Sequence, residues 1–419
     1  MSSRSPSGTP AGDGDFWSYY ERLNDLIAEE SWAAGEQLAE LFSCQHKHAQ
    51  SRDFQVEDIE EDFGERDVFS SVFDDMVAIH CRVLFYLARK QAEDAFATQM
   101  ALLQYYNKEI LTKEKDMNWF CPILDTLCTD LRIIASMADS TREVIDEEAK
   151  SYLEEATSPI MERNAINITK KVAIMSLTNQ LFRIYFRINR LPLLKPLIRA
   201  IEQSGPLRDH FALSDEITYK YFVGRKAIFD NDLPLANEAL SFAFDRCPEE
   251  FAKNKRLILI YLIPVKMFLG FMPNHAVLQQ YELDCFEELV MAVKEGNVGR
   301  LERALTDQQD FFIDAGIFLM VEKLKMTTFL NLIKLMHKIS DSAQIKIESI
   351  VAILSRTGVE MQERRSELPV GQLDPPGELF PCIVLIPFVR SLQKKMKGYI
   401  SYNHQTLVLS KLAPFPQPT

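Results

Sequence analysis

The sequence predicts a mainly α-helical protein: a right-handed array of tetratricopeptide-like helical hairpins followed by a C-terminal winged helix. Three observations predict it. Apolar residues recur at the three- and four-residue spacing of helices over most of the 419 residues. Only 15 Gly and 19 Pro occur, too few for a sheet-rich fold with many tight turns. Near the C-terminus, two short β-prone runs, 398–401 and 406–410, flank a four-residue polar turn, which indicates a hairpin.

The N-terminal part is predicted to hold helical repeats over residues 15–210. Residues 1–14 are rich in Ser, Pro and Gly and offer almost nothing to bury, so we expect a disordered lead and no secretory signal. Helical periodicity begins at Phe16. The segment 53–75 is strongly acidic, with Arg66 as its only basic residue, and we interpret it as a solvated loop rather than a docking site for a basic partner.

From Met76 onward the apolar pattern predicts a succession of amphipathic helices. Apolar residues fall on one face in three clear stripes, and the third ends where Pro192 and Pro196 remove backbone donors. The stripes are Met76, Val77, His80, Val83, Leu84 and Leu87; Ile123, Leu124, Leu127, Leu131 and Ile134; and Leu177, Leu181, Ile184, Tyr185 and Ile188.

Residues 217–248 are the most specific part of the repeats, within a predicted helical region over 211–328. A turn at 230–232 separates two helices, and Pro234 lies in the first turn of the second, where proline is tolerated. The tetratricopeptide spacing places small residues where two antiparallel helices approach closely. Ala227 occupies the tyrosine position of that pattern, so the match is degenerate. The matching residues are Gly224, Ala236, Leu240, Ala243 and Pro248.

The pattern changes over residues 329–411, which we predict to form a small winged helix. A helical stripe over 329–336 precedes a short β-like run at 344–347, a helix at 350–354 and the terminal hairpin. An atypical Pro-rich insertion near 366–388 interrupts this module, and proline breaks a helix interior. Residues 412–419 are predicted to be a tail.

Composition excludes several classes of protein. Apolar types make up 47% and charged types 26%, the balance of a soluble protein that buries its core without metal or disulfide. The formal net charge of −13 argues against a protein whose whole surface binds nucleic acid, but it is compatible with a local basic patch.

The seven Cys are scattered without a C-x-x-C pair, and no apolar run is long enough for a membrane span. We therefore expect a reducing intracellular compartment.

Signatures of catalysis and cofactor binding are missing from the sequence, so we predict a protein that is not an enzyme and uses no cofactor. Phosphate-binding glycine loops, the zinc-protease H-E-x-x-H and the hydrolase G-x-S-x-G do not occur. Cys44, His46 and His48 lie close together, but without a second ligand pair we interpret them as a polar helix end and not as a metal site.

One charge feature points to a binding surface. From Leu379 to Thr419 the sequence contains no acidic residue. Basic side chains beside a hairpin can contact phosphates, while Tyr399, Tyr402 and His404 can stack on bases. The alternative is a basic surface that docks an acidic protein, and charge spacing alone favours neither. The predicted nucleic-acid-binding residues are Arg390, Lys394, Lys395, Lys397 and Lys411. The apolar side of the hairpin, at Leu407 and Leu409, is the predicted partner-binding side.

Five long runs and the ending Pro414-Phe415-Pro416 resemble the PCI-domain family, which supplies subunits to the proteasome lid, the signalosome and initiation factor three. Within that family, the chain is most similar to the subunit of the transcription and export complex 2. The resemblance covers roughly residues 70–416 and is strongest over 179–335 and at the terminal hairpin. The runs are 179–189, 195–201, 218–230, 254–270 and 397–410.

The resemblance implies a scaffold that couples transcription to messenger RNA export at the nuclear pore. Relatives pair with a large scaffold subunit, resembling germinal-centre-associated nuclear protein, through adjoining winged helices that together form a basic platform for RNA or DNA. A small acidic disordered subunit, shared with the proteasome, clamps their helical part. The implied location is the nucleus at the nuclear pore, with the cytoplasm as a further compartment.

One departure and one alternative accompany this resemblance. Relatives carry a short recognition-type helix just before the hairpin, where this chain has its Pro-rich insertion. The alternative function is a PCI scaffold subunit of a proteasome-lid or signalosome-type assembly, in which the winged helix only joins subunits. The basic C-terminal segment without acidic residues favours nucleic-acid binding, because a winged helix that only joins subunits does not need such a segment.

Overall fold

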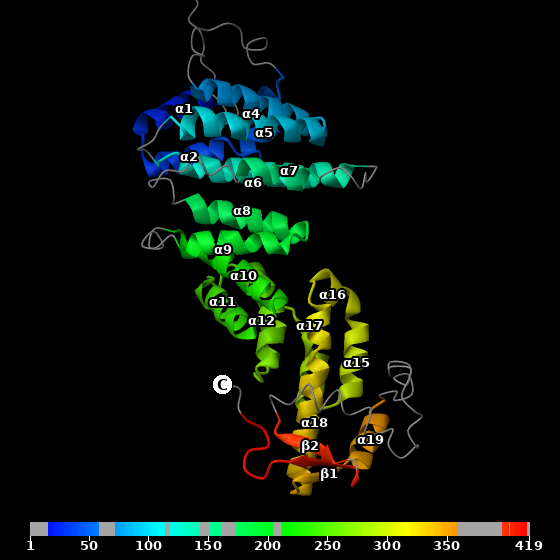
Figure 1. The fold of residues 1–419 in the computed structure, drawn as a ribbon. Helices are drawn as coiled ribbons and strands as arrows, with labels where there is room; N and C mark the ends of the chain where they lie inside the picture. Colours follow the sequence, from blue (N-terminus) through cyan, green and yellow to red (C-terminus); the bar gives the residue numbers. More distant parts are fainter. Residues whose placement is uncertain are drawn as a thin grey trace, which may run out of the picture. The chain divides into compact units, whose positions relative to one another are not determined.

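The computed structural model describes residues 16–57, 72–113, 118–142, 151–160, 173–203, 211–358, 396–401 and 403–416. Over these ranges the chain is mainly helical, which confirms the predicted fold class (Figure 1). Contacts divide it into two compact units, Met1–Phe222 and Val223–Thr419. The predicted lead and the Pro-rich insertion lie outside the described residues.

The first unit is a succession of antiparallel helical pairs. Its helices are α1 (Phe16–Glu29), α2 (Trp32–Leu41), α4 (Val72–Ala88), α5 (Ala92–Tyr106), α6 (Cys121–Thr141), α7 (Tyr152–Ile160), α8 (Ile174–Arg187), α9 (Leu194–Glu202) and the first part of α10 (Leu213–Phe229). Helix α6 contacts α2, α5, α7 and α8, so it is central in the unit. Fully buried side chains include Phe16, Phe42, Tyr106 and Phe120. The amphipathic stripes read from the sequence supply this core.

The acidic segment predicted as a loop at 53–75 needs a correction at its end. Helix α4 begins at Val72, so Asp74 and Asp75 lie in its first turn, where carboxylates complement the helix dipole. Asp74 is buried and accepts a hydrogen bond of 2.6 Å from the Tyr20 hydroxyl. At the other end Asp53 belongs to a short 3₁₀ helix, Arg52–Phe54. Residues 58–71 lie outside the described ranges.

A hydrogen-bonded chain of three histidines lies among aromatic rings of the first unit, with His48 and His80 buried and His46 partly exposed. The Nδ1 atoms of His46 and His48 are 2.9 Å apart, and the Nε2 atoms of His48 and His80 are 3.0 Å apart. Burial lowers the pKa of His48 to about 4, and it also lowers the pKa of His80. Both imidazoles are therefore neutral in the folded protein at neutral pH.

Acidification is expected to destabilise the first unit through these histidines. Their unfolded pKa is near 6.5, so below that pH the unfolded chain takes up protons that the folded chain does not bind. Stability is then fully present above about pH 6.5 and is lost as pH falls toward about 4, by about 2–3 kcal/mol. Melting temperatures measured across this window check it. His48→Gln is expected to flatten the dependence, and an unchanged slope in that variant would contradict the assignment.

The second unit is also mainly helical and ends in a small sheet. Its elements are the rest of α10, α11 (Leu233–Arg246), α12 (Ala252–Phe268), α13 (His275–Gln280), α14 (Glu287–Glu295), α15 (Val298–Asp307), α16 (Gln309–Asp314), α17 (Phe318–Glu322), α18 (Leu324–Ser340), β1 (Gln344–Lys346), α19 (Ile347–Arg356), β2 (Gly398–Ser401) and β3 (Thr406–Leu409).

Helices α10 and α11 form the hairpin that the tetratricopeptide spacing predicts. Asp232 caps α11 by accepting a hydrogen bond from the Leu235 amide at 3.2 Å. A Cβ atom on Gly224 would lie 2.5 Å from Cγ of Leu240, so the two helices meet at a position that only glycine allows. Ala236 and Ala243 are completely buried. The predicted close approach is confirmed at Gly224, while Ala236 and Ala243 are buried on α11, which also packs on α12.

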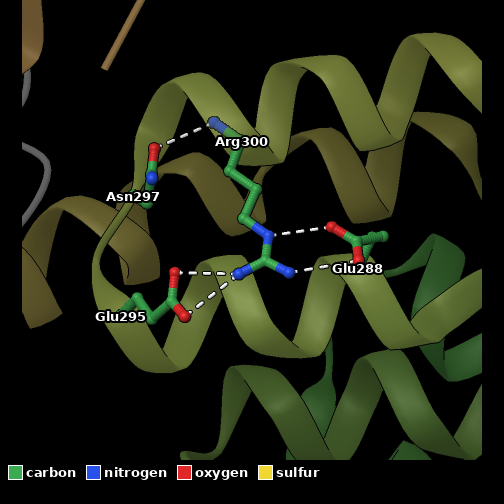
Figure 2. A network of polar contacts seen from close by, with 4 residues as sticks. All are labelled: Glu288, Glu295, Asn297 and Arg300. Atoms are coloured by element: carbon green, nitrogen blue, oxygen red, sulfur yellow. Dashed lines mark hydrogen bonds and ion pairs between the residues drawn. The ribbon is translucent and has the colours of Figure 1, made fainter. Parts of the chain in front are cut away.

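The α14–α15 turn is held by a polar network around Arg300 (Figure 2). The guanidinium binds Glu288 through two hydrogen bonds of 2.8 and 3.1 Å and Glu295 through two of 3.0 Å. Asn297 caps α15 by accepting a hydrogen bond of 2.9 Å from the Arg300 amide. Gly296 has φ +69°, and a Cβ atom there would lie 2.5 Å from the Leu332 nitrogen in α18. The turn is thus packed directly on α18.

The C-terminal sheet has the strand order β1-β3-β2, with both pairs antiparallel. Helices α18 and α19 flank β1 in the chain, as expected for a winged helix. Helix α19 is longer than the predicted 350–354 helix, and β3 ends one residue before the predicted 406–410 run. Buried residues of α15, α18, α19, β1 and β3, with Met396 just before β2, form one core. Its members are Val298, Phe329, Leu330, Leu332, Ile333, Ile345, Ile347, Ile350, Leu354, Met396, Leu407 and Leu409.

Candidate nucleic-acid and partner interface on the winged helix

The three-stranded sheet has one face on the core and one face outward. Ile345, Leu407 and Ile400 are cross-strand neighbours, and they point toward the core. Because side chains alternate along a strand, the next cross-strand row points the other way. That outer row contains Gln344, Val408 and Tyr399, and Tyr399 is 63% exposed.

Leu407 and Leu409 are core residues, which corrects the orientation expected for them. They are 1% and 3% exposed and belong to the cluster formed with α18 and α19. From sequence alone, the apolar side of the hairpin is predicted to face a partner. The chain's own helices cover that side, because the register directs every second residue of β3 inward. An apolar contact with a partner must therefore use other residues.

Two of the five predicted basic residues lie together at one end of the hairpin. The Ser410 amide donates a hydrogen bond of 2.8 Å to the Lys397 carbonyl, which places Lys411 next to Lys397. The Lys397 amide donates in turn to the Pro414 carbonyl, also at 2.8 Å. Both lysine side chains are exposed. Arg390, Lys394 and Lys395 lie outside the described residues, as does Tyr402.

Lys346 is a further exposed cation, outside the set predicted from the sequence. It pairs with Thr406 across β1 and β3, near the hairpin turn that contains the exposed His404. Within the described part of the winged helix, cations therefore lie at both ends of the hairpin, with Tyr399 on the face between them. Lys346 is about 50 positions before Lys397 in the sequence, and only strand pairing brings it to the hairpin.

An exposed apolar pair lies on helix α18. Leu335 is 45% exposed and Ile339 is 76% exposed, and their four-residue spacing places them on one face. On the same helix, the centroid of the Phe415 ring lies 5.9 Å from that of the His337 ring and 5.8 Å from Nζ of Lys334, so residues after β3 fold back onto α18. Leu335 and Ile339 thus form a small exposed apolar patch on α18.

Metal and membrane sites receive no support from the described residues. In those ranges no group of three or more His, Cys, Asp or Glu side chains could hold a metal ion. His46 and His48 use their ring nitrogens on each other and on His80. Across the same ranges, the helices found are too short or too polar to cross a bilayer.

Comparison with known proteins points to one family. No family model matches the chain. It is 41% identical to the PCI domain-containing protein 2 homolog of Caenorhabditis elegans over 416 residues, covering 95% of this chain and 96% of that relative. Identity to PCI domain-containing protein 2 of Danio rerio is 37% over 395 residues, with 91% and 93% covered. Enhanced ethylene response protein 5 of Arabidopsis thaliana is 30% identical over 309 residues, with 71% and 70% covered.

Proposed function

Because the chain belongs to the PCI domain-containing protein 2 family and is a PCI protein of the scaffold type, we propose that it is a non-enzymatic adaptor of the transcription and export complex 2. In this role it couples transcription to messenger RNA export and contributes to nucleic-acid binding. Its site of action is then the nucleus, at the nuclear pore.

The observation that carries the nucleic-acid part of the proposal is the distribution of charge on the winged helix. Lys346, Lys397 and Lys411 are exposed cations in a chain of net charge −13. Lys397 and Lys411 belong to the segment after Glu378, which contains no Asp or Glu, whereas Lys346 has the exposed Glu348 two residues away. Lysines in this setting bind phosphates by releasing condensed counterions, and Tyr399 offers a ring for stacking. The predicted residues Arg390, Lys394 and Lys395 extend the same basic segment in the sequence.

The proposed protein partners are those that the family resemblance implies. A large scaffold subunit resembling germinal-centre-associated nuclear protein joins at the winged helix, and a small acidic disordered subunit joins at the helical part. Since Leu407 and Leu409 are in the core, we place the apolar contact with the large subunit at Leu335 and Ile339 of α18. An apolar anchor beside a basic surface lets protein and nucleic acid bind without competing.

Reversing the winged-helix charges is expected to remove nucleic-acid binding and leave partner capture intact. In the variant Lys346→Glu/Lys397→Glu/Lys411→Glu, affinity falls for all sequences alike, because phosphate contacts read no bases. The slope of log affinity against log salt becomes shallower by about 0.7 per lost contact for single strands. Mobility shifts of the assembled complex at two salt concentrations measure both effects. The same change at Lys394, Lys395 and Lys397 tests Lys394 and Lys395, which lie outside the described ranges, together with Lys397.

The matched control is the opposite variant, Leu335→Asp/Ile339→Asp. It should lose the large subunit in co-purification from nuclear extract, while the chain itself still binds nucleic acid. If the lysine variant instead loses the large subunit, the basic segment is a protein-docking surface. That result would overturn the proposal and favour a PCI subunit of a proteasome-lid or signalosome-type assembly.

A further inference from the structure

A second acid-free basic segment lies in the first unit, far from the winged helix in the sequence. Between Ala173 and Ile201 the chain contains no Asp or Glu. This segment includes all of α8 and nearly all of α9, and its five cations have exposed side chains. We call this set the α8–α9 basic face: Arg183, Arg187, Arg190, Lys195 and Arg199.

A tight reversal brings these cations together. Helix α8 ends at Arg187, and Asn189 then takes a left-handed conformation with φ +55°. The Arg190 amide donates a hydrogen bond of 2.8 Å to the Tyr185 carbonyl, which closes the turn. Helix α9 returns against α8, as the neighbouring green helices in Figure 1 show. Arg187, Arg190 and Lys195 therefore surround one turn.

The two outer members extend the face along both helices. Arg183 lies four residues before Arg187 on α8, and Arg199 lies four residues after Lys195 on α9. Residues at this spacing share a helix face and are about 6 Å apart along the axis. Arg183 and Arg187 therefore form one short row of cations on α8, and Lys195 and Arg199 form another on α9. Both rows extend from the turn between the two helices.

These charges are poorly compensated by the protein. Of the five, Arg190 has an ion pair within the described residues, to Glu154 at 3.6 Å, and both of those side chains are at least one-third exposed. Arg187, Lys195 and Arg199 have no ion pair there. Arg183 faces Asp215 and also Arg132 of α6, whose pKa it helps to lower through like-charge repulsion. A concentration of like charge attracts a polyanion.

We propose that the α8–α9 basic face is a second nucleic-acid site that binds the sugar–phosphate backbone without reading bases. This second site is additional to the proposed winged-helix site, and the argument for it does not depend on that site. Four of the five cations are arginines, whose planar guanidinium matches a phosphate with two hydrogen bonds. Within the described part of 173–203, Leu193 is the one large apolar side chain that is exposed. A protein interface needs a larger apolar centre than this, so the face favours nucleic acid over an acidic protein.

The test compares two triple charge reversals in the full-length chain. Arg187→Glu/Lys195→Glu/Arg199→Glu removes the face. Lys47→Glu/Arg52→Glu/Lys90→Glu makes the same charge change at exposed positions elsewhere in the first unit. Fluorescence anisotropy with a labelled oligouridine of about 20 nucleotides reports binding. Circular dichroism and melting temperature confirm that both variants are folded.

The expected result is a loss of about tenfold or more in affinity for the first variant, with a salt slope shallower by about 2 for three lost contacts. The control variant should lose much less. Adding the winged-helix lysine variant should weaken binding further, because the two sites are separate. Equal binding by the two triple variants would overturn the proposal. So would tight binding of labelled polyglutamate that the first variant alone abolishes, because the face would then be a site for an acidic protein.

Discussion

Ala243→Asp is expected to destroy the α10–α11 hairpin and, with it, assembly. Ala243 is completely buried on α11, on the helix whose Leu240 meets Gly224 of α10. An aspartate there must either bury an unpaired charge or force the helices apart. Either outcome costs more than about 3 kcal/mol. Thermal unfolding followed by circular dichroism should show a large loss of melting temperature, and both protein partners should no longer co-purify.

Leu235→Asp is the matched control for this experiment. Leu235 lies on the same helix but is 43% exposed, so its carboxylate stays in water and the expected change is about 0.5–1 kcal/mol. Normal folding and partner capture by Ala243→Asp would show that the close helix contact does not determine the stability of this hairpin. A defect of equal size in both variants would point to a general intolerance of charge on α11.

Gly296→Ala is expected to give the second large effect. The alanine must keep φ near +69° and place its Cβ atom 2.5 Å from the Leu332 nitrogen and 2.7 Å from its Cα atom. These are main-chain atoms of α18 and cannot move aside as a flexible side chain can. The left-handed conformation costs about 1–2 kcal/mol, and the clash adds a displacement of the α14–α15 turn. The melting temperature should therefore fall strongly.

Gly316→Ala separates the cost of the left-handed backbone from the cost of the clash with α18. Gly316 has the same φ of +69°, but a Cβ atom there meets nothing within 4 Å. Its substitution should cost the backbone strain alone, about 1 kcal/mol. If both alanine variants melt alike, the close packing of the turn on α18 is not important.

The Gly296 substitution should also weaken the proposed nucleic-acid binding of the winged helix. Leu332 belongs to the core that includes Leu407 of β3, so movement of the turn disturbs the support of the sheet. Weaker oligonucleotide binding by Gly296→Ala, with binding by Gly316→Ala close to normal, is the expected outcome. Loss of stability without any change in binding would show that the sheet holds its shape independently of this turn.

Helix and strand positions could be predicted from local sequence because they depend on local periodicity. Helix α8 follows the stripe from Leu177 to Ile184, and β2 spans the predicted run 398–401. The small residues of α10 and α11 were also readable, because close helix approach requires glycine or alanine at fixed spacing. Boundaries were less accurate, since capping and tertiary contacts decide where a helix such as α19 begins and ends.

Residue orientation and the grouping of distant charges required the tertiary structure. The sequence shows that Leu407 and Leu409 share one side of a strand, but only the packed helices show that this side faces inward. Asp74 reads as part of an acidic loop until Tyr20 is found hydrogen-bonded to it across more than fifty residues. Lys346 joins the basic hairpin through strand pairing, and the cations of α8 and α9 meet through a chain reversal. Periodicity is set by neighbours along the chain, whereas exposure and charge clustering are set by whichever elements pack together in space.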